Sequence, residues 1–407
     1  MADTVHSNVP RAPVVGLVLP GGGARSAYQA GVLDGIARLC NPHEPAPFPV
    51  IVGTSAGSIN AAYLAACVSE FAPAAARLCE LWGNLEVEQV YRADTGNIFS
   101  VALRWLWTLM TRGLSDGNPR ALLDNAPLRR LLGDNMTFAD IQRNIDNGAL
   151  RGLGITTAGY ASERSLTWYQ ANREVQPWWR ERREGRPATM TLEHIMASLA
   201  LPIIFPAARI GDEWCGDGST RQLAPLSPAI HLGAKKLLII DTQYPAPMRK
   251  LNNQEEVPYP SFSRIAGYLL DTIFSDSLYA DLERLEQINR ILERRSAAAE
   301  GAEKLALHPI ETMLITPSSR VVTLAARHEK ALPKGIRWLL RALGDRGSGG
   351  DLLLSYMLFE AVYCRDLIEL GRHDALARGE DLRRFLGISQ TRTVPAEEAV
   401  PEKPALQ

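Results

Sequence analysis

The residues best suited to chemistry in this chain begin with a serine between two glycines. Gly53, Thr54, Ser55, Ala56 and Gly57 follow a short β-branched run, and a segment of helix-forming residues starts directly afterwards. A G-x-S-x-G pattern between a strand and a helix is typical of a nucleophile elbow, in which the serine hydroxyl stands clear of a sharp turn. The glycines permit that turn, and the helix directs its first N–H groups toward negative charge. We predict Ser55 to be the nucleophile; the alternative is a small-residue turn with a helix-capping serine.

A second motif, three consecutive glycines, lies earlier in the chain. Gly21, Gly22 and Gly23 follow the apolar run 13–19, which predicts a strand buried on both faces. Glycines between a strand and a helix leave backbone N–H groups free to point at an anion, either a phosphate or the oxyanion of an acyl-transfer intermediate. The phosphate-binding pattern G-x-x-x-x-G-K-[ST] is absent and Ser26 breaks the G-x-G-x-x-G frame, so we favour the oxyanion. A simple tight turn would not need three glycines.

A serine nucleophile also needs a base to accept its proton. No downstream histidine lies in a glycine-bounded loop or at the end of an expected buried strand; the candidates are His231, His308, His328 and His373. A carboxylate can take the role if burial raises its pKa toward the working pH. Asp217 stands between Gly216 and Gly218, in what we expect to be a tight loop. It is either the base or a turn aspartate that hydrogen-bonds its own backbone, and the residues alone leave both open.

The elements that must position these residues indicate an α/β fold. Further strands are expected over 150–158, 166–169 and 237–241, the last closing the sheet, and a helix over 191–201. We expect residues 203–206 to be extended. The tryptophans and mixed charges over 173–184 favour a solvated loop or a connecting helix.

The chain divides into four parts. We predict a disordered N-terminus over 1–12, a hydrolase domain over 13–245, a mainly helical extension over 246–390 and a disordered tail over 391–407. Within the extension, helices are expected over 262–295, 335–343 and 352–370, with one strand-like piece at 310–315. A very apolar stretch, 98–110, is too short as a helix to cross a bilayer. It is a core helix, a lid over an acyl pocket or a membrane contact.

The amino-acid composition of the chain argues against several classes of function. The chain has 407 residues, 46% of them hydrophobic and 22% charged, with a net charge of −1, which gives no pull toward nucleic acid. Its five scattered cysteines contain no C-x-x-C pair, so they predict reduced thiols and no zinc site. The N-terminus lacks the apolar core of a signal peptide. We therefore expect a cytoplasmic protein, and leave peripheral membrane contact open.

Four ordered blocks together resemble the patatin-like phospholipases. The resemblance covers roughly residues 14–245, and the order and spacing of the blocks make it far more specific than any one of them. The blocks are residues 21–25, residues 53–57, residues 197–206 and residues 217–219.

The resemblance implies a three-layer α/β fold with a mostly parallel sheet, and a lipid acyl hydrolase with a serine–aspartate dyad and no catalytic histidine. It implies Ser55 as nucleophile, Asp217 as base and the N–H groups of Gly21, Gly22 and Gly23 as the oxyanion hole. Arg25 matches the basic residue that closes the glycine block, and we expect it to fix that loop or to steady a phosphate. The supporting residues are Gly53, Gly57, Arg25 and Gly218.

Three small departures from the family pattern bear on activity more than on fold. Pro20 precedes the glycines, Ser26 replaces a final glycine, and Ser219 stands where glycine or alanine is usual. We predict hydrolysis of acyl esters in phospholipids or other lipids, with no metal or organic cofactor. The alternatives are an acyltransferase or thioesterase that acts on acyl thioesters, and a catalytically silent lipid-binding protein.

Overall fold

The computed structural model describes residues 13–92, 121–245, 259–298, 308–333, 335, 337 and 351–388. Its centre is a sheet of ten strands in the order β10-β9-β1-β2-β3-β4-β6-β5, with β8 also paired to β3 and β7 paired to β8. The strands β10, β9, β1, β2 and β3 are parallel neighbours. Beyond β3 the pairing is mixed, because β4 and β8 run antiparallel to it. The predicted mixed α/β fold with a mostly parallel sheet is confirmed. The strands are β1 (Val15–Leu19), β2 (Val50–Thr54), β3 (Gly152–Gly159), β4 (Ser165–Ala171), β5 (Trp178–Arg180), β6 (Arg183–Pro187), β7 (Ala208–Ile210), β8 (Glu213–Asp217), β9 (Lys236–Ile240) and β10 (Glu311–Ile315).

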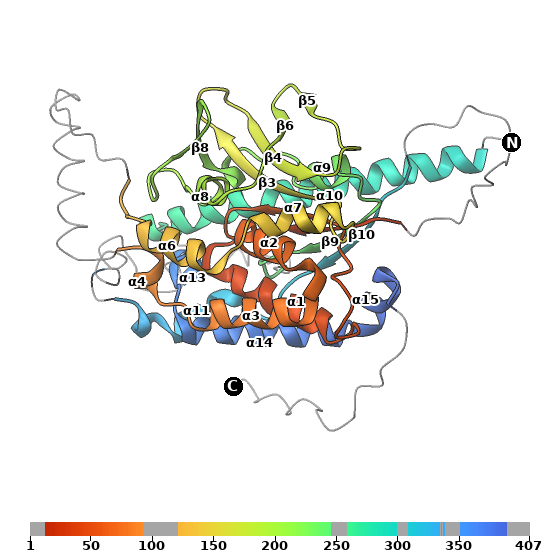
Figure 1. The fold of residues 1–407 in the computed structure, drawn as a ribbon. Coiled ribbons are helices and arrows are strands. Elements are labelled where there is room, and N and C mark those ends of the chain that lie inside the picture. The colour runs from red at the N-terminus through yellow and green to blue at the C-terminus, as the bar shows by residue number, and fades with distance from the viewer. Residues whose placement is uncertain are drawn as a thin grey trace, which may run out of the picture.

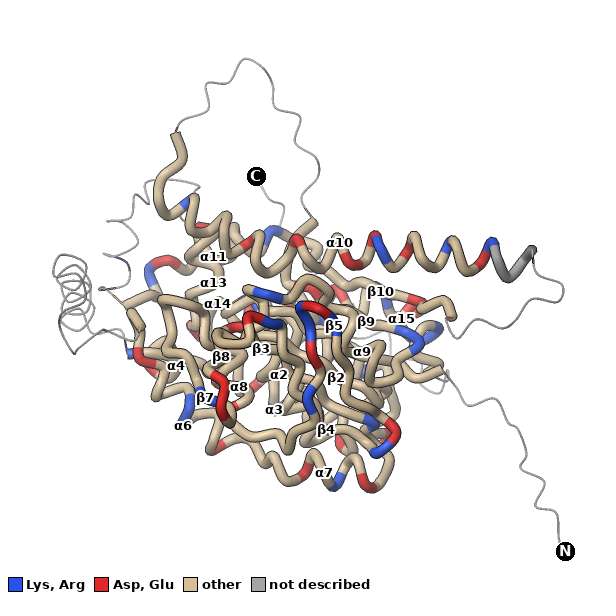
Figure 2. Tube along the Cα trace, turned by 90° about the horizontal axis from the view of Figure 1, so that it is seen from above, with Lys and Arg blue, Asp and Glu red and all other residues tan. Residues whose placement is uncertain are grey.

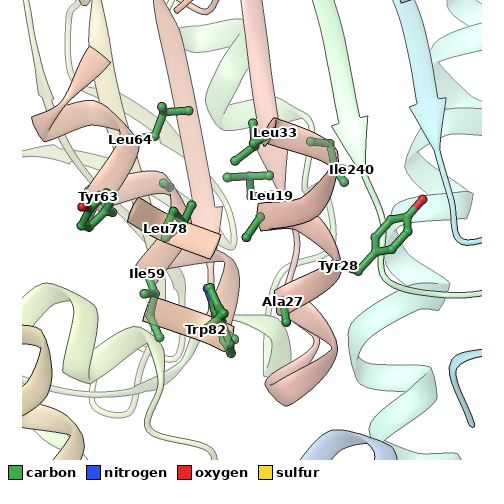
Figure 3. Close-up of a cluster of buried hydrophobic side chains, with 14 of the residues drawn as sticks. Leu19, Ala27, Tyr28, Leu33, Ile59, Tyr63, Leu64, Leu78, Trp82 and Ile240 are labelled. Atoms are coloured by element: carbon green, nitrogen blue, oxygen red, sulfur yellow. The ribbon is translucent and has the colours of Figure 1, made fainter. Parts of the chain in front are cut away.

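Alternating side chains of the parallel strands enter two separate hydrophobic clusters. Leu17, Leu19 and Ile51 belong to one cluster, together with residues of α1 (Ala27–Ala37), α2 (Ala56–Ala66) and α3 (Phe71–Gly83). Figure 3 shows part of it. Val18 and Val52 belong to the other, with Leu278 and Leu282 of α10 (Phe262–Ala298). Since successive side chains of a strand point to opposite faces, the sheet is covered by helices on both sides. Figure 1 shows these layers.

The remaining helices connect and cover these layers. The chain after β10 returns to the α1 side of the sheet, where α14 packs along α1 (Figure 1). Among the described helices, none combines the length and apolar character needed to cross a bilayer. These elements are α4 (Val87–Val90), α6 (Ala126–Asn135), α7 (Ala139–Asp146), α8 (Leu192–Ser198), α9 (Ser227–His231), α11 (Val321–Arg327), α13 (Asp351–Met357), α14 (Ala361–Ala377) and α15 (Gly379–Leu386), with 3-10 turns η1 (Gly23–Ser26), η2 (Val68–Glu70), η3 (Gly218–Thr220) and η4 (Glu329–Ala331).

The structure corrects two predictions in the middle of the chain. Residues 173–184 were expected to be a loop or helix but contain β5 and the start of β6, an antiparallel pair that extends the sheet. Trp178 stacks on Tyr169, with 4.9 Å between ring centroids, whereas Trp179 on the same strand is exposed. Residues 203–206 form a turn rather than an extended segment. Ile203 has φ +72°, and its carbonyl accepts the N–H of Leu122.

Three further differences lie at the ends of elements. Asp217 is the last residue of β8 rather than part of a tight loop. The strand β9 does not close the sheet, because β10 pairs with it on the outside. The helix expected over 352–370 is divided into α13 and α14 around residues 358–360. The stretches 98–110 and most of 335–343 lie outside the described residues, and the division of the chain at residue 246 stays a prediction.

Candidate active site

Ser55 occupies a strained turn between β2 and α2. Its φ of +52° is unusual for a residue with a side chain, and such strain is held only when the surroundings enforce it. They do so here, because a Cβ at Gly57 would lie 2.1 Å from the carbonyl oxygen of Leu19, and one at Gly53 would lie 2.6 Å from the Cβ of Ala61. The two glycines thus let α2 lie directly against the ends of β1 and β2. The serine is fixed by this packing at the start of the helix.

The sheet brings Asp217 to this serine from a distant part of the sequence. Thr54 on β2 pairs with Thr156 on β3, and the next residue of β3 pairs with Asp217 on β8. The Oγ of Ser55 donates a hydrogen bond of 2.5 Å to Oδ2 of Asp217, and both side chains are buried. The pairing of three strands therefore explains how two residues 162 positions apart form one pair.

The surroundings of Asp217 suit a base. Burial raises the pKa of its carboxyl group to about 6, although hydrogen bonds from Ser55 and from the backbone N–H of Ser219 oppose that shift. The Ser219 N–H donates to Oδ1 at 2.9 Å. A Cβ at Gly218 would lie 2.2 Å from the carbonyl oxygen of Thr156, so glycine allows the chain to turn tightly against β3 after the aspartate. A carboxylate with this pKa is ionised at neutral pH and can still accept a proton.

A serine that carried no predicted role supports the elbow from α8. Ser198 Oγ accepts the backbone N–H of Ser55 at 2.8 Å and donates to the carbonyl oxygen of Thr156 at 2.7 Å. This fully buried hydroxyl connects the backbone of Ser55 to β3. Its sequence signal is weak, because it is one small polar residue at the end of a short helix that also contains Glu193 and His194.

The glycine loop follows β1 and lies beside the elbow. Gly23 has φ +55° and lines the same cavity as Ser55 and Asp217. Side chains from later in the chain pack closely against Gly21 and Gly22. A Cβ at Gly21 would lie 2.7 Å from the ring of Phe274, and one at Gly22 would lie 2.4 Å from Oγ1 of Thr242. A side chain at either position would therefore force the loop or its neighbour to shift.

Arg25 is fully buried and ties this loop to the C-terminal region. Its guanidinium donates to Ser355 Oγ at 2.9 and 2.6 Å and to Gln243 Oε1 at 2.8 Å, and it lies 3.5 Å from a carboxylate oxygen of Asp271. It also stacks on the ring of Tyr356, with 3.8 Å to the centroid. Of the two roles expected for Arg25, these contacts favour fixing the loop.

A second buried carboxylate, Asp241, stands behind the loop at the end of β9. It accepts the N–H of Thr242 at 2.7 Å and the hydroxyl of Tyr279 at 3.0 Å. Burial raises its pKa to about 6 as well, against the lowering effect of these hydrogen bonds. Because Thr242 contacts Gly22, Asp241 belongs to the support of the loop. Nothing in the sequence pattern singled it out.

An apolar cavity opens onto the serine. Beside Gly23, Ser55 and Asp217, its walls come from α2, α3, α6, α10 and α13 and from the turn after α8. The apolar side chains among them include Ile59, Leu81, Trp82, Leu85, Leu128, Leu132, Leu201, Phe205, Leu270, Phe274, Met357 and Phe359. A cavity of this lining is suited to hydrocarbon chains, and it provides few polar partners for a charged substrate.

The predicted residues thus come together in one place. Ser55 and Asp217 are in contact, and the glycine loop lies at the same end of β1 and β2. Within the described part of the chain, no histidine hydrogen-bonds to either residue of the pair. The described residues also contain no cluster of three or more side chains suited to hold a metal ion. The roles of these residues in catalysis stay predictions.

Comparison with known proteins identifies the family. Residues 17–230 match the family model described as patatin-like phospholipase, so the chain belongs to that family. No curated protein sequence matches the chain. Among solved structures, the crystal structure of VipD from Legionella pneumophila is similar with a TM-score of 0.33 and 11% sequence identity, over 82% of this chain and 67% of that one. A likeness of that size carries no weight for the site.

Proposed function

We propose that this protein hydrolyses acyl ester bonds of phospholipids or related lipids through an acyl-enzyme on Ser55, with Asp217 as the base. Membership in the patatin-like phospholipases supports lipid acyl hydrolysis in general. The observation that carries the specific proposal is the 2.5 Å hydrogen bond from Ser55 Oγ to a buried carboxylate at the end of an apolar cavity.

The geometry supports a two-step reaction. Asp217 accepts the hydroxyl proton while Ser55 Oγ attacks the ester carbonyl carbon, and the negative charge moves to the carbonyl oxygen. We propose that N–H groups of the glycine loop, together with that of Ala56 at the start of α2, stabilise this oxyanion. When the tetrahedral intermediate collapses, the departing alcohol takes the proton from Asp217. Water then attacks the acyl-enzyme, gives its proton to Asp217 and releases the fatty acid, and Ser55 regains its proton.

Covalent labelling tests the nucleophile directly. We expect a fluorophosphonate probe to label the protein at one serine, and we expect Ser55→Ala to abolish that labelling without loss of the folded state. Ser69→Ala is a matched control, because its hydroxyl lies at the surface and bonds Asn144, away from the cavity. Labelling that persists in Ser55→Ala would show that another residue is the nucleophile.

A substrate panel separates the proposal from its alternatives. Labelled acyl chains should be released from phospholipids faster than from acyl thioesters, and not at all by Ser55→Ala. Preference for acyl thioesters would favour the acyltransferase or thioesterase. Absence of both labelling and turnover in a folded protein would favour a catalytically silent lipid-binding protein.

A further inference from the structure

The first turns of α10 carry an exposed apolar patch. It consists of Tyr259, Phe262, Ile265, Tyr268 and Leu269, whose side chains expose between 38 and 92% of their surface. At 100° per residue, the four members on the helix lie within an arc of about 120°. Isolated exposed apolar residues are ordinary in soluble proteins, but five within eleven positions, four of them on one face of the helix, are typical of an interaction site.

The other side of the same helix forms a wall of the active-site cavity. Leu270 and Phe274 line that cavity beside Ser55, and Phe274 packs against the glycine loop. The backbone of α10 also lies close to α13, since a Cβ at Gly267 would meet Leu352 at 3.0 Å. The patch therefore belongs to an element that is held firmly against the site. A molecule bound to the patch would be within one to three helical turns of the cavity wall.

Charge distinguishes this part of α10 from the rest of the helix. Residues 259–270 contain one charged side chain, the exposed Arg264, and no acidic one. The second half of the helix carries acidic and basic residues mixed together, and this half extends past the sheet (Figures 1 and 2). The charged residues from 271 to 294 are Asp271, Asp276, Asp281, Glu283, Arg284, Glu286, Arg290, Glu293 and Arg294.

We propose that this patch docks the protein on the surface of a phospholipid bilayer. Aromatic rings with polar tips suit the boundary between headgroups and acyl chains, and a lone arginine can pair with lipid phosphates. The absence of acidic residues from the patch avoids repulsion by those phosphates. The inference rests on the proposed function, because docking here would bring the bilayer against the same helix that forms a wall of the cavity containing Ser55.

Vesicle binding tests the docking surface. The test uses the full chain with Ser55→Ala, so that bound lipid is not consumed, and vesicles of phosphatidylcholine with a fraction of phosphatidylglycerol. Phe262→Ala, Tyr268→Ala and Leu269→Ala together should weaken co-sedimentation with the vesicles at least tenfold. The matched control is Ile288→Ala with Ile291→Ala, two side chains that expose 41 and 64% of their surface on the projecting half of α10. The control should bind as the parent does.

Activity on two kinds of substrate completes the test in the chain that retains Ser55. The triple variant should hydrolyse the soluble ester p-nitrophenyl butyrate at the parent rate and phospholipid in vesicles at least tenfold more slowly. Circular dichroism and the melting temperature verify that the variant is folded.

The possible negative results contradict different proposals. Unchanged vesicle binding by the triple variant would overturn the docking surface while leaving the hydrolase proposal intact. Loss of a dimer in sedimentation, with no change on vesicles, would show that the patch binds a second copy instead. A parent protein that binds vesicles through the patch but is neither labelled at Ser55 nor active on either ester would overturn the proposed function alone.

Discussion

The elbow and the glycine loop border one cavity, but different parts of the chain hold them in place. The elbow is held from within the segment that matches the family: Thr156 and Ser198 fix its backbone, and Asp217 receives its hydroxyl. The glycine loop is held by residues that come after that segment. These are Thr242, Gln243, Asp271, Phe274, Ser355 and Tyr356.

This difference assigns a task to the C-terminal region. By sequence it is a helical extension without a recognisable motif. In the structure it supplies an edge strand to the sheet, a wall of the cavity and the side chains around Arg25. We infer that the nucleophile and its base can be specified by the matched segment, whereas the loop that is to stabilise the oxyanion depends on the C-terminal region for its position.

Replacement of the base should have the largest effect on turnover. Asp217→Asn retains the shape of the side chain but removes the carboxylate, so kcat should fall by about 10³–10⁴, the upper range for loss of general-base assistance. In the wild type, kcat/KM should decline as pH falls through about 6, because protonation of the carboxyl group removes the base. Steady-state kinetics between pH 4.5 and 8.5 check both statements. Turnover in Asp217→Asn above one tenth of normal would remove this residue from the mechanism.

The elbow was predictable because its signals are local. Ser55, Gly53 and Gly57 lie within five residues, and a Cβ added at either glycine would lie only 2.1–2.6 Å from a backbone oxygen. Asp217 was found through its flanking glycines, although the strand that ends with it was missed. Its partners on β3 are fixed by strand pairing, which a single sequence does not display.

The residues that support the glycine loop were not predictable either, because contacts between distant parts of the chain are not visible in a single sequence. The pairs Arg25–Ser355 and Gly22–Thr242 join positions more than 200 residues apart, and neither Ser355 nor Thr242 stands in a pattern. The sequence also did not predict the strand β6, because its charged residues obscure the usual alternation of a strand. Length and hydrophobic period did reveal α10, which the structure shows as one helix.

Crowding of the glycine loop should have the next largest effect. Gly22→Ala would place a Cβ 2.4 Å from Thr242 Oγ1, so either the loop or Thr242 must shift, and we expect the loop to move together with its N–H groups. Loss of one oxyanion donor raises a barrier by about 3 kcal/mol, so kcat should fall by about 10². Removal of the hydroxyl by Thr242→Ala in the same chain should restore part of that loss. Gly133→Ala is the control, because its Cβ would be 3.6 Å from Leu192, an ordinary contact. Equal activity of Gly22→Ala and wild type would show that the glycine loop has no role in catalysis.

Substitution of Arg25, which fixes the glycine loop, should have a smaller effect on the rate of turnover. Arg25→Lys removes the forked donor pair to Ser355 and the stacking on Tyr356, which an ammonium group does not reproduce. We expect kcat to fall about tenfold with KM within twofold, and unfolding to become about 1–3 kcal/mol easier.

The control for this substitution separates loop positioning from general stability. Arg365→Lys also loosens a C-terminal helix, since Arg365 Nε donates to the carbonyl oxygen of Gly83, but it touches no part of the loop. It should lower stability and leave kcat unchanged. Parallel losses of kcat in both variants would mean that Arg25 acts only through stability.

The smallest effect on activity is expected at the second buried carboxylate, where stability should respond instead. The pKa of Asp241 is about 6 in the folded chain and about 4 when unfolded. Between these pH values the folded state binds more protons, so this group's contribution to stability falls as pH rises from 4 to 6. Asn cannot ionise, and its oxygen can still accept the Thr242 N–H. As pH rises from 4.5 to 7.5, the free energy of unfolding of Asp241→Asn should therefore increase by on the order of 2 kcal/mol relative to that of the wild type.

Denaturant unfolding at the two pH values measures this change in stability. The pH dependence of kcat/KM then shows whether Asp241 also affects catalysis. Because Ser55 hydrogen-bonds to Asp217 and not to Asp241, we expect the decline of kcat/KM below pH 6 to remain in Asp241→Asn and to disappear only in Asp217→Asn. If the decline vanished in Asp241→Asn as well, the two carboxylates would titrate as one coupled system, and the elbow and the loop would no longer be separately supported. If it persists, the two buried acids perform different tasks, one as proton acceptor and the other as a structural anchor of the loop.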